Sequence, residues 1–538
     1  MHRCKTIIIT GGTVSGIGKG ITAASIGRIL IDRGFTVSVV KADPYLNQDA
    51  GTMNPFQHGE VFVTDDGAET DLDLGHYERF MDVNLSKFSN FTSGSVYRTV
   101  MEHEREGDFL GKTIQIIPHV TDEIKHRIDQ ACKESITDFL LVEIGGTIGD
   151  IEALPFIEAL RQYQSTAPTD TIFAHVVKMD YLYPSDEGKT KPIQHAVTTL
   201  RSYGIQPNIL IVRCKRNITV EEKEKISLFT GVVSNRIVPA KDAKSLYDIP
   251  AQLEASGLAG AILSSFGLDT STPSVPAWKD MYAHMAARKQ KIRVGLVGKY
   301  VKNSDAYLSV IEAISHAGIF NEVFTEIVAI DSELPVEVET VSDLDAVIVP
   351  GGFGVRGIEG KIRAIQIARE NKVPFLGICL GLQTAVIEIA RHKAGLGKAT
   401  SSEFDETSST PVIAILPDQM HIKKKGGTMR LGQYEAVLSK DSLAESLYLT
   451  YRPEEVTDGT VLERHRHRYE VNPKYKEVLT KVGLIVSGVS PDGSLVEFIE
   501  LAQTEHPYFI ATQAHPEFRS RPHRPHPLFA GLIRAAIS

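Results

Sequence analysis

The sequence has 538 residues, 42% hydrophobic and 23% charged, and is too long for a single hydrophobic core, so we expect an ordered protein of two or three domains. Its net charge of -9 and pI near 6.1 argue against general nucleic-acid binding, which leaves a basic footprint. The longest apolar runs have the length of strands and fall far short of the roughly 20 residues that span a bilayer, so we expect no membrane span.

The N-terminus and the cysteines bear on the cellular compartment. Residues 1–5 run directly into an apolar stretch and leave no room for a signal peptide, so we expect a cytoplasmic protein. The four cysteines lie far apart without a CxxC pair, which argues against a disulfide framework and a zinc site. We expect Cys4, Cys132 and Cys214 each to be a small buried hydrophobe, and treat Cys379 separately below.

Apolar runs of strand length alternate with helix-like segments along the chain. Continuous apolar runs are typical of strands covered on both faces, which predicts mostly parallel α/β sheets. The pattern restarts at Ile292 after a linker-like stretch, so we predict domains at 1–267 and 292–538 with a linker at 268–291. The expected strands are 6–9, 36–40, 139–142, 172–177 and 209–212 in the first domain, and 292–297, 346–349, 375–378, 412–416 and 508–512 in the second.

A glycine-rich turn connects the first expected strand to a helix. Glycine N–H groups, the helix N-terminus and the Lys19 ammonium can all face phosphate oxygens. The match to a strict P-loop is imperfect, because Thr13 stands where the first glycine would be and Gly20 replaces the usual Ser or Thr. A turn of purely structural use is the alternative. The predicted phosphate cradle consists of Ser15, Gly16, Ile17, Gly18, Lys19 and Gly20.

Because Gly20 offers no hydroxyl, a nucleotide-bound Mg²⁺ must find other ligands. Asp73 lies in an acidic stretch, and Glu143 ends a buried strand, where ligands gather in open α/β sheets. Mg²⁺ takes one or two carboxylates plus phosphate oxygens, so we predict Asp73 and Glu143 as its ligands. The alternatives are a solvated turn for Asp73 and a helix-capping acid for Glu143.

A basic turn could hold a second triphosphate. It presents two lysines around a proline, and an acidic segment, Gly149–Glu152, follows the strand that carries Glu143. Solvated surface is the alternative, and the residues do not identify the nucleotide. The turn consists of Lys189, Thr190, Lys191, Pro192, Ile193 and Gln194.

The strongest local signal is the segment 374–383, an apolar strand followed by Gly-Ile-Cys-Leu-Gly and a helix. This arrangement predicts a nucleophile elbow that exposes Cys379 at a helix N-terminus, where the thiolate is favoured. The N–H of Leu380 and the glycine turn at Gly352 can then stabilise an oxyanion. The segment therefore predicts a cysteine nucleophile for acyl transfer.

A base follows the strand that ends at Thr512. On an extended backbone residues i and i+2 point the same way, so we expect Glu517 to orient His515 while His515 faces Cys379. The three residues predict a Cys-His-Glu triad, and hence a glutaminase that releases ammonia for a nucleotide-using synthetase in the first domain. Some of the arginines of the run 464–470 are expected to hold a carboxylate such as that of glutamine. Nucleic acid is disfavoured because Glu463 and Glu470 flank the run and the whole chain is acidic.

Together the motifs resemble the CTP synthase family over essentially the full chain. The strings that carry the resemblance are Gly-Lys-Gly at 18–20, Lys-Ala-Asp-Pro-Tyr at 41–45, Asn-Pro-Phe-Gln-His-Gly-Glu-Val at 54–61, the stretch 66–80, Lys-Thr-Lys-Pro at 189–192, Gly-Ile-Cys-Leu-Gly at 377–381 and Arg-His-Arg-His-Arg-Tyr-Glu at 464–470. The resemblance implies a P-loop, dethiobiotin-synthetase-like amidoligase domain with a parallel sheet, joined to a class I glutamine amidotransferase α/β domain.

The resemblance also implies the chemistry. ATP would phosphorylate O4 of the UTP uracil ring, and ammonia from glutamine, or free ammonia, would displace the phosphate to give CTP. Mg²⁺ would act with ATP, and no organic prosthetic group is implied. The resemblance assigns ATP to Ser15–Gly20, Asp73, Lys241, Asp242 and Ala243; UTP and the product CTP to Ser15, Asp150, Ile151, Glu152, Lys189–Gln194 and Lys225; and glutamine to Gly352, Leu380, Gly381, Leu382, Gln383, Glu403 and Arg468.

Regulation and assembly are likewise implied by the resemblance only: GTP as activator, CTP as inhibitor and a homotetramer. Two alternatives stay open. The chain could be another two-domain synthetase, such as a cobyrinic or cobyric acid amidase, although the match at 54–80 and the turn at 189–192 argue against it. It could also be a nonenzymatic P-loop scaffold or a partitioning-type ATPase, although the set Cys379, His515 and Glu517 argues against that.

Overall fold

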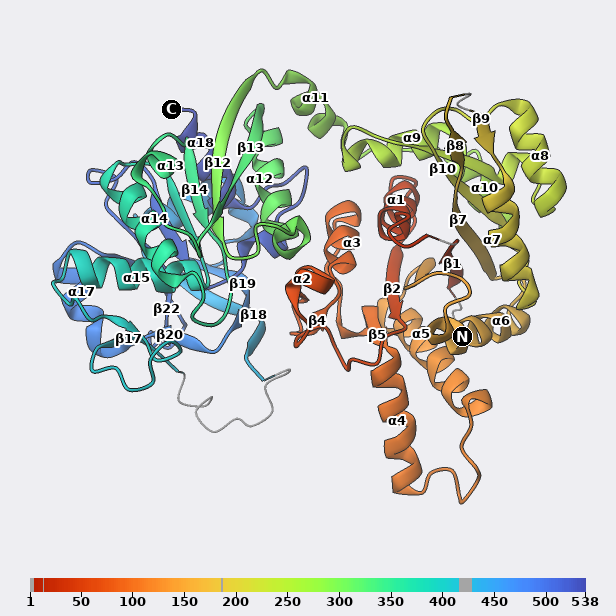
Figure 1. The fold of residues 1–538 in the computed structure, drawn as a ribbon, viewed down its shortest axis with the longest axis horizontal. Helices are drawn as coiled ribbons and strands as arrows, with labels where there is room; N and C mark the ends of the chain where they lie inside the picture. Colours follow the sequence, from red (N-terminus) through yellow and green to blue (C-terminus); the bar gives the residue numbers. More distant parts are fainter. Residues whose placement is uncertain (1–3, 13, 185–186, 416–427) are drawn as a thin grey trace. The chain divides into compact units, whose positions relative to one another are not determined.

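The computed structural model describes residues 4–12, 14–184, 187–415 and 428–538. Thr13 of the glycine-rich turn and Leu416 of the expected strand 412–416 therefore lie outside the described residues. The contacts divide the chain into two compact units, each of which can be followed by colour in Figure 1. Unit 1 comprises Met1–Ala50 and Asp73–Ala277, and unit 2 comprises Gly51–Leu72 and Trp278–Ser538. Among the described helices, none combines the length and apolarity needed to cross a membrane.

Unit 1 is built on a sheet of seven strands that all run parallel, in the order β11-β10-β7-β1-β6-β2-β5. β1 lies in the middle, so its apolar residues are covered on both sides, and Ile9 pairs with Glu143 of β6 at the carboxyl end. The strands are β1 Lys5–Gly11, β2 Val37–Asp43, β5 Asn90–Thr92, β6 Phe139–Ile144, β7 Thr171–Lys178, β10 Ile209–Cys214 and β11 Ile237–Lys241. The parallel sheet predicted from the apolar runs is confirmed.

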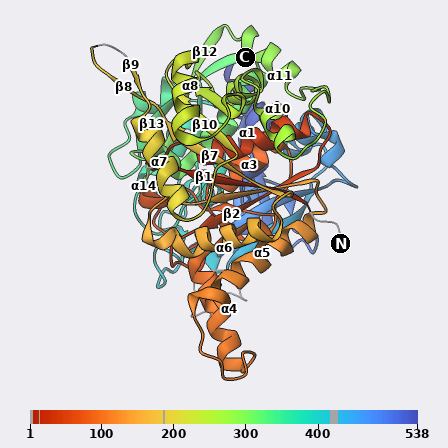
Figure 2. The ribbon, with the colours of Figure 1, turned by 90° about the vertical axis from the view of Figure 1, so that its right-hand side faces the viewer.

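Helices cover both faces of this sheet. α1 and α3 lie on one side of β2, and α5 and α6 lie on the other (Figure 2). A short antiparallel hairpin, β8 Asp180–Leu182 with β9 Glu187–Lys189, follows β7. The helices of unit 1 are α1 Lys19–Ile31, α3 Asp73–Met81, α4 Ser93–Glu106, α5 Thr121–Ser135, α6 Leu154–Thr166, α7 Lys191–Ser202, α8 Val220–Thr230, α9 Ile249–Ala255 and α10 Leu258–Ser265.

A disulfide joins Cys4 to Cys132, with their Cα atoms 6.2 Å apart. Both cysteines are buried, as expected, but the expectation that neither forms a disulfide is wrong. The two residues are 128 positions apart in sequence, and they meet because the start of β1 and helix α5 share one hydrophobic cluster that also contains Ile8 and Ile128. Cys214 is free and buried, as expected.

Unit 2 contains a nine-stranded sheet in the order β13-β12-β14-β15-β23-β22-β21-β18-β19. The half from β13 to β23 is parallel, whereas the half from β23 to β19 is antiparallel. The strands are β12 Gln290–Gly298, β13 Val323–Asp331, β14 Ala346–Val349, β15 Phe375–Ile378, β18 Arg430–Leu438, β19 Thr460–His467, β21 Ile485–Val489, β22 Val496–Glu500 and β23 Phe509–Thr512.

The expected strand 412–416 does not join this main sheet. It corresponds to β17 Pro411–Ile415, which pairs with β16 Thr400–Ser401 and β20 Tyr469–Val471 in a separate small sheet. A second short ribbon pairs β3 Phe62–Val63 with β4 Glu69–Thr70. The helices of unit 2 are α2 Pro55–His58, α11 Lys279–Ala287, α12 Leu308–Phe320, α13 Val338–Ser342, α14 Ile358–Glu370, α15 Leu380–His392, α16 Leu443–Tyr451, α17 Lys476–Lys481 and α18 Pro527–Ala536.

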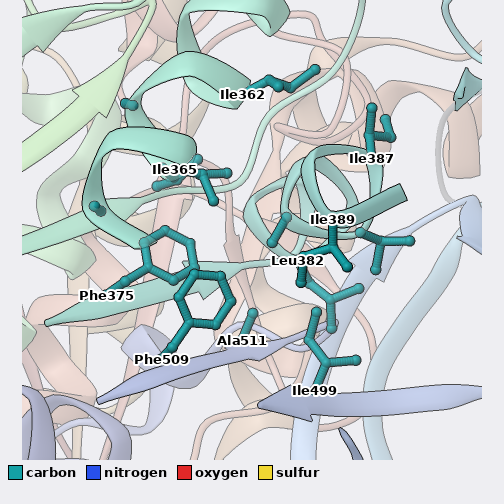
Figure 3. Packing of buried hydrophobic residues seen from close by; sticks show 14 of the residues in the cluster. Ile362, Ile365, Phe375, Leu382, Ile387, Ile389, Ile499, Phe509 and Ala511 are labelled. Atoms are coloured by element: carbon teal, nitrogen blue, oxygen red, sulfur yellow. The ribbon is translucent and has the colours of Figure 1, made fainter. Parts of the chain in front are cut away.

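The main sheet of unit 2 has a hydrophobic cluster on each face. On one face α14 and α15 pack Ile365 and Leu382 against the strands (Figure 3). There Phe375 of β15 and Phe509 of β23 lie with ring centroids 4.6 Å apart. Dense packing on both sides leaves these strands little freedom, so they fix the turns at their carboxyl ends.

The ribbon of β3 and β4 belongs to the segment Gly51–Leu72, which packs in unit 2 although residues 1–267 were expected to form one domain. The segment is tied there by specific contacts. Glu60 accepts hydrogen bonds from the N–H, at 2.8 Å, and the hydroxyl of Ser309. The N–H of Gln433 donates to the carbonyl of Asp65 at 2.8 Å. A single boundary in the sequence cannot describe this arrangement, because a segment of the N-terminal half packs with the C-terminal half.

Candidate active sites

The turn between β15 and α15 presents Cys379 at the first position before the helix. Cys379 has φ 52° and ψ -104°, a strained conformation for a residue with a side chain. The glycines on either side have no room for a larger residue: a Cβ on Gly381 would lie 2.0 Å from the Val349 carbonyl oxygen, and one on Gly377 would lie 2.8 Å from Cβ of Ala511. Packing around the turn therefore leaves no room for a side chain at Gly377 or Gly381, the two glycines predicted to permit the elbow.

His515 and Glu517 lie at the end of β23, beside Cys379. Nδ1 of His515 is 2.7 Å from Oε1 of Glu517, and both side chains are buried. The expected reason for this contact is wrong, since Glu517 belongs to a 3-10 helix, Pro516–Arg519, and not to an extended strand. The tight turn brings the carboxylate back to the imidazole.

The electrostatics of His515 link it to both neighbours. Burial lowers the pKa of His515, but the Glu517 carboxylate and the Cys379 thiolate outweigh burial and raise this pKa to about 10. Nε2 of His515 is buried and, apart from its interaction with Cys379, has no hydrogen-bond partner among the described residues. It is free to exchange a proton with sulfur or with a substrate atom next to the sulfur.

The sulfur has two contacts that sequence reasoning did not predict, one with Gln513 and one with the backbone of Arg466. Gln513 donates from Nε2 to Sγ of Cys379 at 3.8 Å, and the thiol is 3.8 Å from the carbonyl oxygen of Arg466. Gln383, a predicted glutamine contact, donates to the Tyr469 carbonyl at 3.0 Å. The position of Gln513 directly before Ala514 and His515 was the available signal.

The glycine turn after β14 lies against the triad, as the second oxyanion donor requires. A Cβ on Gly351 would be 2.8 Å from Cε1 of His515 and 3.6 Å from Cβ of Cys379, and one on Gly352 would be 3.5 Å from Cδ2 of Leu380. Lys361 of α14 supports this turn by donating to the Pro350 carbonyl at 2.9 Å. Burial, reinforced by the nearby charge of Lys299, lowers the pKa of Lys361 to about 7.

The other predicted glutamine contacts lie in the first turn of α15, beside Gly354, and between β19 and β20. Glu403 accepts a hydrogen bond from the N–H of Gly354 at 2.7 Å, and burial raises its pKa. Leu380, Gly381, Leu382 and Gln383 form the first turn of α15. Arg468 lies between β19 and β20 and donates to the Thr428 hydroxyl at 3.1 Å.

The arginines of 464–468 do not all face one ligand. Arg464 pairs with Asp65 at 2.6 Å, and Arg466 pairs with Glu69 at 2.8 Å. These two arginines therefore hold carboxylates of the protein itself, and the assignment of Arg468 to a substrate carboxylate stays a prediction.

The histidines of the run point to the other face of β19. Nδ1 of His465 is 2.9 Å from Nε2 of His467, and both lie beside Arg430, which pairs with Glu470 and Glu497. Burial, with the nearby charge of Arg430, lowers the pKa of both histidines well below the usual value.

In unit 1 the glycine-rich turn leads into α1. Gly16 and Gly18 have φ 65° and 92°, values that favour glycine. Lys19 is 9% exposed and donates from Nζ to the Gly146 carbonyl at 2.6 Å, and a Cβ on Gly11 would touch its side chain at 2.9 Å. The lysine is thus folded across the loop, with its ammonium at the carboxyl edge of the sheet.

Asp73 and Glu143, predicted to bind Mg²⁺, meet around a single ammonium group. Lys41 of β2 forms ion pairs with Asp73 and, at 2.9 Å, with Glu143, whose other oxygen accepts from the Tyr77 hydroxyl at 2.5 Å. Although burial lowers the pKa of Lys41, the two carboxylates raise it well above its usual value. Sequence reasoning missed this lysine.

The donor set at this point fits Mg²⁺. The Asp73 and Glu143 carboxylates both contact the Lys41 ammonium, so they lie close enough to bind one Mg²⁺ ion together. The remaining Mg²⁺ ligands would come from phosphate and water. Among the described residues, no group of three or more His, Cys, Asp or Glu side chains could hold a metal alone. A Cβ on Gly20 would lie 2.2 Å from Oδ1 of Asp73, so the Asp73 carboxylate fills the space that the Ser or Thr of a strict P-loop would use.

The predicted nucleotide segments gather near this loop. A cavity of about 380 Å³ is lined by Ile17, Gly18 and Thr22 together with Lys241, Asp242 and Ala243. Arg213 connects the two sides of this cavity, with hydrogen bonds to the Ile17 carbonyl at 3.3 Å and to Asp242 at 3.4 Å. Sequence reasoning did not identify Arg213.

The predicted UTP segments lie at the ends of other elements of unit 1. Asp150 binds the N–H and hydroxyl of Thr147 at 2.7 and 2.9 Å, and Ile151 and Glu152 follow it in a short 3-10 helix. Lys189 ends β9, Thr190 precedes α7, and Lys191–Gln194 form its first turn. Lys189 and, less strongly, Lys225 of α8 both lower the pKa of the exposed Glu187, so these two cations lie near the same carboxylate.

The sequence matches two protein-family models. Residues 5–268 match "CTP synthase N-terminus", and residues 303–535 match "Glutamine amidotransferase class-I". A solved structure, the glutaminase domain of Trypanosoma brucei CTPS with bound acivicin, is 37% identical with a TM-score of 0.42, and the match covers 46% of this chain and 94% of that one.

Curated relatives match along the whole chain. The CTP synthase of Carboxydothermus hydrogenoformans is 53% identical over 99% of this chain and 98% of its own length. The CTP synthase of Methanocaldococcus jannaschii is 51% identical over 100% of this chain and 99% of its own. Identity at this level across both units leaves one assignment: the chain belongs to the CTP synthase family.

Proposed function

We propose that the protein aminates UTP to CTP by joining a cysteine glutaminase in unit 2 to an ATP-dependent amidoligase in unit 1. The observation that carries the proposal is the position of Cys379 at a glycine-flanked helix start, next to a His515–Glu517 pair, in a chain that matches CTP synthases along its full length. Over one cycle UTP, ATP, glutamine and water would become CTP, ADP, phosphate and glutamate.

In unit 2 the Cys379 thiolate attacks the amide carbon of glutamine. The N–H groups of Leu380 and Gly352 stabilise the oxyanion, and His515 passes a proton to the departing ammonia. Water, activated by His515, then hydrolyses the thioester to glutamate. We assign Glu403 and Arg468 to the α-amino and α-carboxylate groups of glutamine, because they carry the opposite charges that these two groups require.

In unit 1 the γ-phosphate of ATP is transferred to O4 of the uracil ring. Ammonia then attacks C4 and phosphate leaves, which replaces a carbon–oxygen bond by a carbon–nitrogen bond. Lys19 and the N–H groups of Ser15–Gly20 bind phosphates, and Lys241–Ala243 line the cavity beside them. Mg²⁺ held by Asp73 and Glu143 would neutralise phosphate charge.

We assign UTP to Asp150–Glu152, Lys189–Gln194 and Lys225, with Ser15 shared between the two nucleotides. Product CTP would occupy part of the same site as an inhibitor, because the triphosphate is common to both. Activation by GTP and a homotetramer are further proposals that rest on the family resemblance.

The test measures CTP formation by its near-ultraviolet difference from UTP, with ATP, Mg²⁺ and either glutamine plus GTP or ammonium chloride. We expect product with both nitrogen sources. Cys379→Ala should abolish the glutamine-dependent reaction and keep the ammonium-dependent one, because free ammonia bypasses the triad. If wild-type protein formed no CTP with ammonium, the synthetase assignment would be refuted, and a corrinoid acid would be the next substrate to try.

A further inference from the structure

Within unit 2, two ion pairs hold the segment Gly51–Leu72 against strand β19. Asp65 pairs with Arg464 and Glu69 with Arg466. The Arg464 side chain is 0% exposed and that of Glu69 is 2% exposed. A charge buried to this degree is strongly destabilising once its partner is removed, so the pairs hold the segment against the strand.

The two arginines contact the catalytic residues through their main chain. The carbonyl of Arg464 accepts the N–H of His515 at 2.7 Å, and the carbonyl of Arg466 is 3.8 Å from Sγ of Cys379. Each arginine therefore contacts a catalytic residue with its backbone and the segment with its side chain. A displacement of the segment is transmitted to β19 at the two points where the triad is supported.

A second set of contacts leads from the segment to the imidazole. Phe62 of β3 lies edge-on to Phe518 at a centroid distance of 5.0 Å, and Phe518 stacks on His515 at 5.2 Å with 14° between the planes. The segment also lines a cavity of about 200 Å³ together with His515 and Glu517, to which it contributes Gly51 and Val61.

The other end of the segment is covalently continuous with the metal ligands. Leu72 is followed directly by Asp73, which begins α3 and forms the ion pair with Lys41. Glu69 is four residues before Asp73, so the chain between them spans at most about 14 Å. The segment thus connects Asp73, a proposed Mg²⁺ ligand of the synthetase site, to the arginines of β19 that contact the glutaminase triad.

We propose that Gly51–Leu72 is a positioning segment of the glutaminase site, anchored by the Glu69–Arg466 and Asp65–Arg464 pairs. Binding of ATP and UTP at the Asp73 end raises the rate of glutamine hydrolysis at Cys379 through these pairs. The inference rests on the proposed function. If the pairs served folding alone, their loss would lower stability without a selective effect on hydrolysis.

The test uses full-length Glu69→Gln and Asp65→Asn, which keep the side-chain shape and remove the charge. Glu388→Gln is the matched control, because Glu388 and Arg369 form a pair with the same burial, 0% and 13% exposed, against 2% and 14% for Glu69 and Arg466. Neither partner of the control pair contacts a triad residue or the segment through a hydrogen bond or ion pair among the described residues.

Three rates are measured for each protein: glutamate release without nucleotides, glutamate release with ATP and UTP, and CTP formation with ammonium. A displacement of about 1 Å at a catalytic group costs up to about 100-fold, so we expect a fall in kcat of about 10- to 100-fold for glutamine hydrolysis, with KM within about threefold. The increase with ATP and UTP should be lost, and ammonium-dependent CTP formation should stay within about twofold.

We expect Glu388→Gln to lose a similar amount of thermal stability and to keep both glutamine hydrolysis and its response to nucleotides. The inference is overturned if Glu69→Gln hydrolyses glutamine like the control, if the wild-type rate does not respond to ATP and UTP, or if ammonium-dependent activity falls in parallel. Wild-type CTP formation with ammonium tests the proposed function separately, so its failure cannot be mistaken for a failure of this inference.

Discussion

Substituting Gly20 tests whether Asp73 has taken over the space of the P-loop hydroxyl. In Gly20→Ala the new Cβ would lie 2.2 Å from Oδ1 and 2.7 Å from Cγ of Asp73, far inside van der Waals contact. The Asp73 side chain is short and is held by Lys41, so it must rotate away from the position it shares with Glu143. Overpacking of this kind costs about 1–3 kcal/mol, and a side chain that can rotate puts the cost near the lower end.

The effect on activity should exceed the effect on stability, because the displaced atoms are the proposed metal ligands. Loss of a supporting contact at a metal site costs about 10- to 100-fold, and we expect ammonium-dependent CTP formation to fall by at least that factor. Gly20→Ser should fail equally, although it restores the hydroxyl that a strict P-loop has at this position. Glutamate release without nucleotides should not change.

Gly260→Ala is the control, since Gly260 lies in helix α10 of the same unit and a Cβ there meets no atom within 4 Å. It should keep full activity and gain up to about 1 kcal/mol from helix propensity. The measurement is ammonium-dependent CTP formation as a function of Mg²⁺ concentration, together with thermal unfolding. Full activity of Gly20→Ala at limiting Mg²⁺ would refute the reasoning.

Three further outcomes are expected. Glu517→Gln removes a carboxylate that helps to raise the pKa of His515 to about 10. In wild type the charged imidazole stabilises the fold in full below its ordinary pKa of 6.5, and this stabilisation is lost as pH rises through about 10. The variant should therefore show a smaller loss of stability in alkaline unfolding titrations, and an unchanged profile would contradict the pairing. Lys361→Met removes a buried amine whose pKa is lowered from 10.5 to about 7. The charge on this amine lowers stability in full below about pH 7, and the cost shrinks as pH rises from about 7 to the ordinary pKa of 10.5, so the variant should unfold at a higher temperature than wild type at pH 6 and this difference should shrink steadily above pH 7. A lower unfolding temperature than wild type at pH 6 would count against this account. Gly381→Ala places a Cβ 2.0 Å from the Val349 carbonyl and should destabilise unit 2 by about 3 kcal/mol in denaturant titrations, and a cost below about 1 kcal/mol would show that the elbow can relax.

The parts of the fold that could be predicted are those in which local sequence and tertiary environment agree. Strands 139–142 and 375–378 are continuously apolar because helices cover both faces. β19 was not predicted because Glu463, His465 and His467 are charged or polar and break the apolar run expected of a buried strand. They are buried against partners such as Arg430 of β18 and His526, which caps α18. No local pattern reports partners that distant.

The candidate sites show the same division. Cys379 could be predicted because its strained turn requires glycines, and these glycines lie within two residues of it in the sequence. The contacts of Lys41, Arg213 and Cys132 were not predicted, because the partner of each lies at least 32 positions away in the sequence. Glu517 was predicted for the wrong reason, since the turn and not the strand brings it to His515.

The exchange of Gly51–Leu72 between the halves of the chain limits how the protein can be dissected. A polypeptide that begins at Trp278 would lack Asp65, Glu69 and the ring of Phe62, so Arg464 and Arg466 would lose carboxylates and the contact beside Phe518 would open. Such a fragment, even if folded, would lack the ion pairs that hold β19 beside Cys379 and His515. An autonomous glutaminase made from this chain should therefore carry residues 51–72 as a grafted loop, and protease nicking within 51–72 should silence hydrolysis while leaving both long fragments intact.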